Sequence, residues 1–395
     1  MTMIGRVGLA LLLVTAQAAI AQPSAVKIGV LLPYTGVLSL QGQDVTRGIE
    51  LHLSRIGGRA GGREIQLVRE DTEGKPDVGL TKIKKLVERD RVDFMIGPVN
   101  SAVALAIRNY VHEQGVPLIV PVAATRVLMV PPLASPSIFR MTDNLDQGTV
   151  PMAAWLMKHT KYRKIIVMGT DFVAGHDAAN AFAASWRAVG GEIVKEVFPP
   201  LGTADFAPYL TQAVGAGADA IWGFIPGADA VRFVKQYREY GLGERLPLVG
   251  HNVLADDVNL PPLGDAALGI VTIGSYTAAL DTPVNRTFVA EYEQRHKIWP
   301  TRYSEQGYTS AQLVTLALES LRGDLRDRAA VREALRKAIG QVKAPRGAVA
   351  FDQYNQLVTD EYILRVERQG GRLVNAILDR IPAVTQEATW TWWKK

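Results

Sequence analysis

The residues best suited to bind a small molecule follow six short β-branched runs, at the places where each run ends. In open α/β sheets, ligands bind beyond the carboxyl ends of the strands, where loops lead into the N-termini of helices. Free N–H groups at such helix starts favour an anionic ligand. The residues in these places are Tyr34, Ser39 and Gln41, then Asn100 and Ser101, then Ala123, Ala124 and Thr125, then residues 171–175, then Ile225, Pro226 and Gly227, and finally His251 and Asn252.

Ser101 is the sharpest of these candidates, because it precedes a predicted helix over 102–114 and is expected to be its N-cap. Its hydroxyl and the free N–H groups of the first turn could hold a ligand carboxylate. Thr125 and the backbone of Ala123 and Ala124 would complete the anion site, since small side chains let a ligand approach the main chain. The alternatives are a plain helix cap for Ser101 and simple packing for the two alanines.

No other pattern in the sequence indicates catalysis or a bound cofactor. The six histidines include no i, i+4 pair and no H-E-x-x-H motif, so no metal site is predicted. The sequence also has no G-x-S-x-G motif and no P-loop. Residues 215–220 match G-x-G-x-x-A, but they follow a predicted helix and lead into a predicted strand, the reverse of what dinucleotide binding requires. We therefore expect a protein that is not an enzyme and has no cofactor.

Composition and charge further narrow the classes of function that the protein could have. The chain has 44 Lys and Arg and 39 Asp and Glu, with a formal net charge of +5. These charges are interspersed rather than clustered, so no nucleic-acid-binding face is predicted. The absence of cysteine excludes disulfides and thiolate metal sites. With 395 residues, of which 48% are hydrophobic, the chain is long enough for two lobes with separate cores.

The first 21 residues have the pattern of an export signal. Met1 to Arg6 carries a positive charge, Val7 to Ile20 is apolar, and Ala19-Ile20-Ala21 has small residues where signal peptidase needs them. Cleavage is expected after Ala21. The alternative is a membrane anchor, but an apolar run of about 14 residues is shorter than the roughly 20 that span a bilayer.

Short β-branched runs alternate with longer amphipathic segments, which is typical of parallel βα units. The predicted strands are 26–32, 64–70, 93–96, 118–121, 164–168, 192–198, 220–224 and 246–249. The predicted helices are 43–54, 77–90, 102–114, 175–189, 205–213 and 228–240, followed by 283–296, 304–321 and 328–339 and then a hairpin-like stretch over 349–381.

The alternation of strands and helices occurs twice, with a polar, extended connector over 139–148 between the halves. The late helices come with too few strands for a third lobe, so the chain is expected to return and complete the first two. Further connectors are predicted near 274–278 and 347–353. The predicted fold is α/β, with two doubly wound parallel-sheet lobes, the first over 22–142 plus 277–348 and the second over 143–276 plus 349–395.

A series of motifs runs in order along nearly the whole chain: Val26 to Pro33 with Thr35-Gly36 and Gly42, the glycine pairs 57–58 and 61–62, Glu70-Asp71-Thr72, Gly97-Pro98 with Ser101, Ala123-Ala124-Thr125, Gly264 with Gly269, and Gly307-Tyr308. Together they resemble the leucine/isoleucine/valine-binding family of periplasmic proteins. The resemblance implies a type I periplasmic-binding fold with three hinge crossovers, a small-molecule ligand in the cleft, and a periplasmic location. It also implies ABC permease and ATPase subunits at the inner membrane as partners. We expect the protein to be a monomer.

Two departures from the family pattern bear on the ligand. Gln41 stands where the amino-acid binders often have an aromatic ring that packs on the ligand. Residues 251–253 (His-Asn-Val) stand where those proteins have an acid for the ligand's ammonium. An unpaired buried ammonium is costly, and Asp171 is the remaining substitute. We expect a carboxylate without an ammonium, with an aromatic acid as the leading hypothesis, a branched-chain or other amino acid as the alternative, and a soluble ligand sensor as the alternative role.

Phe172, Val173 and Ala174 precede a predicted helix and resemble the closing wall of the family's cleft, which usually carries an aromatic. The alternative for Phe172 is a core position, since an aromatic at a strand end also suits a core. Near the C-terminus, Trp390, Trp392 and Trp393 are expected to cover a lobe edge, with membrane contact or a frayed tail as alternatives. The residues expected to contact the ligand are Ser39, Gln41, Asn100, Ser101, Ala123, Ala124, Thr125, Phe172, Ala174, Ile225, Pro226 and Asn252.

Overall fold

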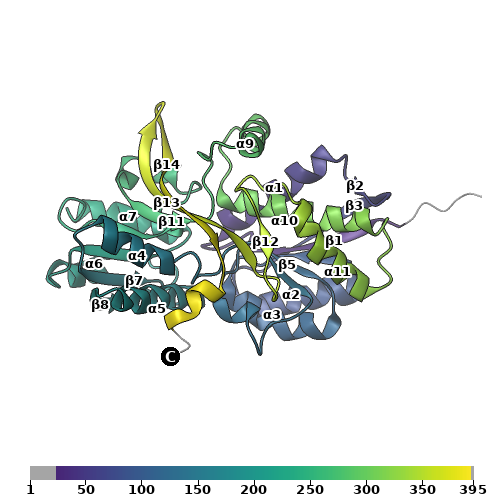
Figure 1. Ribbon diagram of the computed structural model, residues 1–395, viewed down its shortest axis with the longest axis horizontal. Coiled ribbons are helices and arrows are strands. Elements are labelled where there is room, and N and C mark those ends of the chain that lie inside the picture. Colours follow the sequence, from purple (N-terminus) through teal and green to yellow (C-terminus); the bar gives the residue numbers. More distant parts are fainter. Residues whose placement is uncertain (1–23, 393–395) are drawn as a thin grey trace, which may run out of the picture.

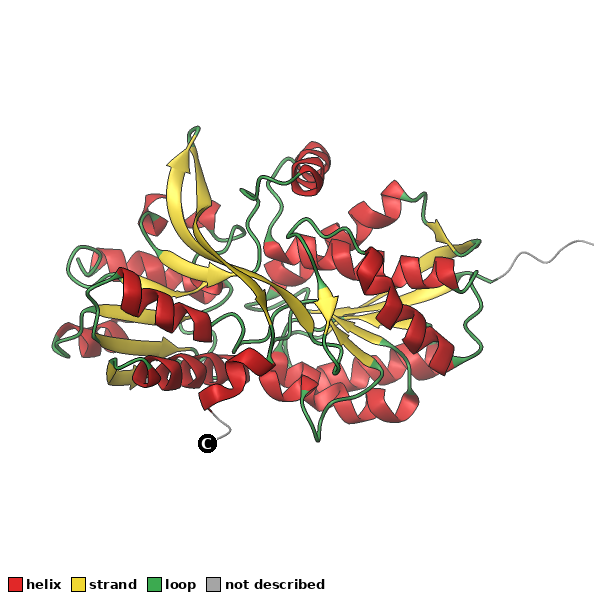
Figure 2. Ribbon diagram, in the orientation of Figure 1, coloured by secondary structure: helices red, strands yellow, loops and turns green. Residues whose placement is uncertain are grey.

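The computed structural model describes residues 24–392, so the predicted export signal at residues 1–21 lies outside the described residues. The described chain forms two lobes that lie side by side, each built of a central sheet and flanking helices (Figures 1 and 2). Within residues 24–392, none of the helices combines the length and apolar composition that a membrane span requires.

The first lobe contains a six-stranded sheet with the strand order β2-β3-β1-β4-β5-β6. Its strands are β1 (Val26–Leu32), β2 (Arg59–Ala60), β3 (Arg63–Asp71), β4 (Phe94–Ile96), β5 (Leu118–Val120) and β6 (Ile138–Arg140). Strand β1 pairs in parallel with β3 and β4. Every residue of β1 except Lys27 is buried, as expected for a central strand with both faces covered.

Five α-helices pack on this sheet. They are α1 (Ser39–Arg55), α2 (Pro76–Lys84), which continues as a π-turn over Lys85–Arg89, α3 (Ser101–Gln114), α10 (Arg302–Ser320) and α11 (Arg328–Ala338). Helices α1 and α10 approach closely, because a Cβ on Gly307 would lie only 2.0 Å from the carbonyl oxygen of Val45. This contact fixes the start of α10 against α1 and brings late residues of the chain to the first lobe.

The second lobe contains an eight-stranded sheet in the order β12-β13-β11-β10-β9-β7-β8, with β14 paired to β13. Its strands are β7 (Lys164–Gly169), β8 (Glu192–Val197), β9 (Ala220–Phe224), β10 (Leu248–His251), β11 (Val271–Gly274), β12 (Ala350–Phe351), β13 (Leu357–Gln369) and β14 (Arg372–Val384). The pairs from β8 to β11 are parallel, whereas β13 pairs antiparallel with β11 and β14. The helices of this lobe are α4 (Val150–His159), α5 (Val173–Ala188), α6 (Ala207–Val214), α7 (Ala228–Glu239) and α8 (Leu260–Leu263). Helix α9 (Pro283–His296) follows β11 and packs against α1 and α10 of the first lobe, where Tyr292 donates a hydrogen bond to Asp44 and Phe288 contacts Tyr308.

The chain passes between the two sheets three times, after β6, after β11 and after α11. The predicted lobe limits at 142/143, 276/277 and 348/349 fall in these passages, and their exact positions stay a prediction. The first passage differs from the expected extended connector, because it begins with strand β6 and residues 141–149 are all buried. Its polar side chains are buried because they find hydrogen-bond partners. Asn144 and Gln147 exchange two side chain to backbone hydrogen bonds, and Gln147 also donates to the carbonyls of Leu357 and Val384.

All eight predicted strands are present, β1 and β9 with the predicted ends and the other six with shifted ends, but β2, β6 and β11 were not predicted as strands. These three are short, with two to four residues each, and so carry little periodicity. At the C-terminus, Trp390 is buried and its ring lies 6.4 Å from that of Tyr354, as expected for a side chain that covers a lobe edge. The side chains of Trp392 and Trp393 lie outside the described part of the chain.

Candidate functional site

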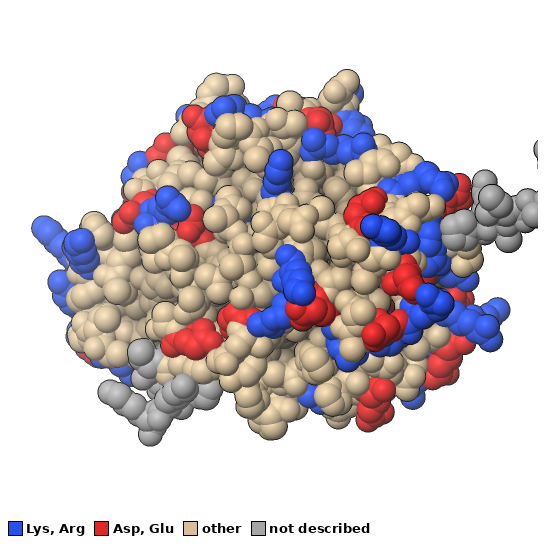
Figure 3. All heavy atoms as spheres, turned by 45° about the vertical axis from the view of Figure 1, so that its right-hand side comes forward, with Lys and Arg blue, Asp and Glu red and all other residues tan. Residues whose placement is uncertain are grey.

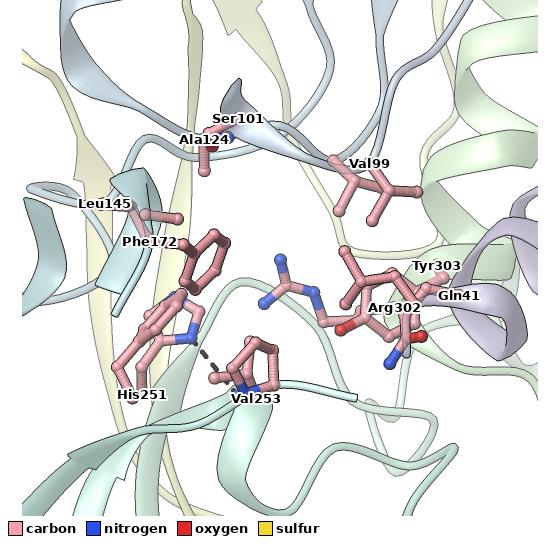
Figure 4. Close-up of a pocket in the computed structure, with 15 residues that line it drawn as sticks. Gln41, Val99, Ser101, Ala124, Leu145, Phe172, His251, Val253, Arg302 and Tyr303 are labelled. Atoms are coloured by element: carbon pink, nitrogen blue, oxygen red, sulfur yellow. Dashed lines mark hydrogen bonds between the residues drawn. The ribbon is translucent and has the colours of Figure 1, made fainter. Parts of the chain in front are cut away.

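A cavity lies between the two lobes. Figure 4 shows its wall, to which both lobes contribute. The lining residues are Leu38, Gln41, Val99, Ser101, Val122, Ala124, Leu145, Phe172, Ala174, Phe224, Pro226, His251, Val253, Arg302 and Tyr303.

Most of this lining lies at the carboxyl ends of parallel strands. In the first lobe, Gln41 follows β1, Ser101 follows β4 and Ala124 follows β5. In the second lobe, Phe172 follows β7 and Pro226 follows β9. Parallel strands end at one edge of their sheet, so residues far apart in sequence meet at a common cleft, as predicted from the strand-end pattern.

The structure changes the role expected for Ser101. The N-cap of α3 is Asn100, whose Oδ1 accepts a hydrogen bond from the backbone N–H of Ala102 at 2.8 Å. Ser101 is instead the first residue of α3, and its Oγ accepts hydrogen bonds from the N–H groups of Ala124 and Thr125 at 3.3 and 3.2 Å. Ser101 therefore lines the cavity, but it occupies two of the N–H groups that were expected to hold a carboxylate.

Thr125 and Ala123 do not line the cavity. The hydroxyl of Thr125 donates to Oδ2 of Asp177 in α5 at 2.5 Å, and its carbonyl accepts a hydrogen bond from Arg140 at 2.6 Å. Ala123 is packed in the core of the first lobe. The packing alternative therefore describes Ala123, and Thr125 connects the lobes instead of completing an anion site.

The other predicted contact residues also fall into two groups, those that line the cavity and those that do not. Ser39 is half-buried at the start of α1, and Ile225 is fully buried in the core of the second lobe. Asn252 lies behind the wall, where its Oδ1 accepts a hydrogen bond from Nη1 of Arg302. Asn100 is the helix cap described above. The predicted residues that do line the cavity are Gln41, Ser101, Ala124, Phe172, Ala174 and Pro226.

Arg302 is the most important residue that the sequence analysis missed. Arg302 is only 3% exposed, and its guanidinium points into the cavity (Figure 4). Its Nε has no hydrogen-bond partner among the described residues, and its Cζ lies 5.2 Å from the ring centroid of Tyr303. The predicted helix began at Ser304, which left Arg302 in a loop. In the structure Arg302 lies in the first turn of α10, where a cation opposes the helix dipole. This unfavourable position is the one feature that could have marked Arg302 as a functional residue.

His251 lines the cavity as a neutral side chain. Its Nδ1 accepts a hydrogen bond from the N–H of Val253 at 3.3 Å, which assigns the proton to Nε2. Burial, and secondarily the positive charge of Arg302, lowers the pKa of His251 to about 3. Arg302 is therefore the cation of the cavity at neutral pH.

The acidic side chains near Arg302 lie behind the cavity wall, and none is among the lining residues. Burial alone would raise the pKa of Asp143, but Arg302 and other donors more than offset this and lower it. Asp256 accepts a hydrogen bond from the Tyr303 hydroxyl at 2.6 Å, and burial raises its pKa to about 7. Asp171, the expected substitute acid, is exposed and does not line the cavity.

This arrangement can hold an aromatic anion. The rings of Phe172 and Phe224 lie 6.3 Å apart at the wall, and such faces bury a flat apolar group well. The guanidinium of Arg302 can donate to a carboxylate. Among residues 24–392, no cluster of His, Asp or Glu side chains is arranged to hold a metal ion.

Comparisons with known proteins agree with this architecture. A sequence model of the family described as "Periplasmic binding protein" matches residues 25–372. The curated "Leu/Ile/Val-binding protein homolog 6" of Brucella melitensis is 29% identical over 353 residues, which cover 88% of this chain and 89% of that protein.

Two solved structures are similar over almost their whole length. An ABC transporter substrate-binding protein from Sphaerobacter thermophilus is 35% identical with a TM-score of 0.84, covering 91% of this chain and 99% of that one. An ABC transporter solute-binding protein from R. palustris in complex with benzoate is 30% identical with a TM-score of 0.86, covering 92% and 99%. They confirm the predicted two-lobed α/β fold of type I with three crossovers. The chain belongs to the periplasmic binding proteins of the leucine/isoleucine/valine-binding family, the substrate-binding proteins of ABC transporters.

Proposed function

We propose that this chain binds a small aromatic carboxylate between its lobes and delivers it to the permease of an ABC transporter. The observation that carries the proposal is Arg302, a buried guanidinium that points into a cavity with apolar and aromatic walls. Burying a charge is costly unless it is paired and hydrogen-bonded. Arg302 already donates to Asn252 and interacts with Asp143, but its Nε has no hydrogen-bond partner among the described residues. A ligand carboxylate would accept a hydrogen bond from this Nε.

The character of the lining also disfavours an α-amino acid. An ammonium group in the cavity would need an acceptor or an anion, and the lining contains no carboxylate. It would lie instead near Arg302, and like charges in a buried site repel strongly. An aromatic acid presents a carboxylate to Arg302 and a ring to Phe172 and Phe224, and leaves no charge unpaired.

The relatives support both candidate ligand classes. The R. palustris protein was solved with benzoate, whereas the Brucella melitensis protein is named for leucine, isoleucine and valine. A branched-chain amino acid is therefore the competing ligand. The acid-free lining around Arg302 favours the aromatic acid.

Delivery to a transporter requires export and partners. Residues 1–21 would direct export, with cleavage after Ala21, and the ABC permease and ATPase subunits at the inner membrane would be the partners. In this role the closed form of the binding protein is the one that the permease recognises. Closure is a population shift, so the ligand must contact the closed state better than the open one.

Isothermal titration calorimetry with benzoate and with leucine tests the ligand. We expect benzoate to bind the native protein and leucine not to bind. Arg302→Met keeps most of the apolar stem but removes the charge, and it should weaken benzoate binding about 10- to 150-fold, the value of a hydrogen bond to a charged group. Arg302→Lys is the matched control, because it keeps the charge and should lose less. Leucine binding without benzoate binding would contradict the proposal.

A further inference from the structure

Arg140 is a charged side chain buried at the hinge between the lobes. It ends β6, where the first passage begins, and it is fully buried, whereas Lys and Arg side chains are spread over the surface in Figure 3. Burial lowers the pKa of Arg140 to about 9, so its guanidinium stays charged at neutral pH. A buried charge is costly unless hydrogen bonds compensate it. The groups that Arg140 binds therefore have to account for its burial.

The guanidinium of Arg140 binds the main chain of a loop in the first lobe. Its Nη1 donates to the carbonyl oxygen of Thr125 at 2.6 Å and to that of Ala123 at 3.4 Å. Ala124 between them lines the cavity. Figure 4 shows Ala124 beside Ser101, whose Oγ accepts hydrogen bonds from the N–H groups of Ala124 and Thr125. The main chain around Ala124 is thus held through carbonyl groups by Arg140 and through N–H groups by Ser101.

Arg140 is also anchored to the hinge. Its Nε donates to Oε1 of Gln356, the residue immediately before β13 of the second lobe. Nε2 of Gln356 in turn donates at 2.8 Å to the carbonyl oxygen of Thr142 and to Oε1 of Gln147, both in the first passage. Nη2 of Arg140 has no hydrogen-bond partner among the described residues. Arg140 therefore connects a loop of the cavity wall to the first passage and to the start of β13.

Thr125 takes part in two of these connections at once. Its carbonyl oxygen is bound by Arg140, while its hydroxyl donates to Asp177 of the second lobe at 2.5 Å. A movement of Thr125 that lengthens one bond also changes the other, so the two bonds should be energetically coupled. Arginine suits this position because its donors stand in a rigid planar fork, whereas the ammonium of lysine is a compact charge on a flexible stem.

We propose that Arg140 is a positioning residue for ligand binding, which holds the loop over 123–125 against the hinge in the geometry that lets Ala124 line the cavity and Thr125 reach Asp177. Arg140 itself does not line the cavity, so it acts on the ligand only through this loop. Its loss should therefore reduce closure and ligand affinity together, without changing the order of preference among ligands. The part of the inference that concerns affinity rests on the proposed function, whereas the part that concerns closure does not.

Calorimetry with benzoate and small-angle X-ray scattering of the free protein test the inference. Arg140→Lys keeps the charge but cannot bind the two carbonyl groups and Gln356 together. It should weaken benzoate binding about 10-fold, the value of a hydrogen bond to a charged group, and increase the radius of gyration. Gln356→Met leaves Arg140 in place without its anchor and should change both quantities in the same direction.

The matched control is Arg108→Lys. Arg108 in α3 binds two main-chain carbonyl groups in the same way, those of Leu133 and Ala134 at 2.6 and 3.3 Å. None of these three residues lines the cavity. Arg108→Lys should therefore leave the benzoate affinity and the radius of gyration unchanged. Equal losses of affinity from Arg140→Lys and Arg108→Lys would overturn the inference.

A double variant separates positioning from a general loss of stability. Thr125→Val should weaken benzoate binding up to about 5-fold in the native and Arg108→Lys backgrounds, but less than about 2-fold in Arg140→Lys, where the loop is already displaced. The same effect in all three backgrounds would contradict the proposed coupling. If Arg140→Lys does not fold, Gln356→Met serves as the background instead.

The scattering measurement distinguishes a failure of this inference from a failure of the proposed function. If benzoate does not bind the native protein, the proposed function fails, and the radius of gyration still decides whether Arg140 positions the loop for closure. An unchanged radius of gyration in both Arg140→Lys and Gln356→Met would then overturn the inference. If benzoate binds the native protein and both variants equally well, the inference alone fails.

Discussion

The hydrogen bond between Thr125 and Asp177 joins the two lobes, and the variant Thr125→Val tests whether it holds the cleft closed. Thr125 follows β5 in the first lobe, Asp177 lies in α5 of the second, and their side-chain oxygens are 2.5 Å apart. Valine has nearly the same shape but cannot donate. A hydrogen bond to a charged group contributes about 1.5–3 kcal/mol. Because Asp177 is only half-buried, solvent screening reduces this to about 1 kcal/mol.

A loss of about 1 kcal/mol lowers the ratio of closed to open protein about 5-fold. The ligand binds the closed state, so its apparent affinity should fall by up to the same factor for every ligand alike. The side chain of Thr125 does not line the cavity, and therefore the order of preference among ligands should not change. Small-angle X-ray scattering of the free protein should report a larger radius of gyration.

The matched control is Thr125→Ser, which keeps the hydroxyl and should behave like the native protein. Two results would refute the reasoning. Unchanged affinity together with an unchanged radius of gyration would mean that the bond does not affect closure. A loss confined to one ligand would mean that Thr125 contacts the ligand.

Three further variants test the buried framework in equilibrium urea unfolding. Burial raises the pKa of Asp256 to about 7 in the folded state, so the stability that its protonated form contributes is lost as pH rises from about 4 to about 7. The stability of Asp256→Asn relative to the native protein should therefore be higher at pH 8 than at pH 5. The same stability difference at both pH values would exclude this assignment. Arg346→Met leaves the buried carboxylate of Glu305 without its partner and should cost about 3–5 kcal/mol, whereas a loss below 1 kcal/mol would argue against an ionised pair. Gly307→Ala should cost about 1–3 kcal/mol by separating α1 from α10, while Gly340→Ala, with open space around it, should change little; equal effects would contradict the packing argument.

Much of the fold follows from local pattern. The alternation of apolar runs and amphipathic segments was sufficient to predict the strands that became β1, β3, β4, β5, β7, β8, β9 and β10, because each buried strand and each helix carries its own periodicity. The strands β2, β6 and β11 were not predicted, because they are too short to show a clear periodicity of their own. The passage over 141–149 was misjudged because its polar side chains are buried through hydrogen bonds, several of them to residues distant in the sequence, such as those from Gln147 to Leu357 and Val384.

The site was predictable only in part. Gln41, Ser101, Ala124, Phe172, Ala174 and Pro226 line the cavity as expected from their strand-end positions. Arg302 could not be placed by the same rule, because it begins a helix that follows no strand of the first lobe. Its position depends on the packing of α10 against α1, where Gly307 meets α1.

The sequence alone determined the order of strands and helices, the two-lobed architecture and the general location of the cleft, because these depend on residue periodicity and strand direction. Only the tertiary structure decided which side chains face the cavity. Thr125 turned to Asp177, Asn252 to Arg302, and Ser101 to the N–H groups of its neighbours. Each of these outcomes depends on contacts between residues distant in the chain, and local pattern does not encode such contacts.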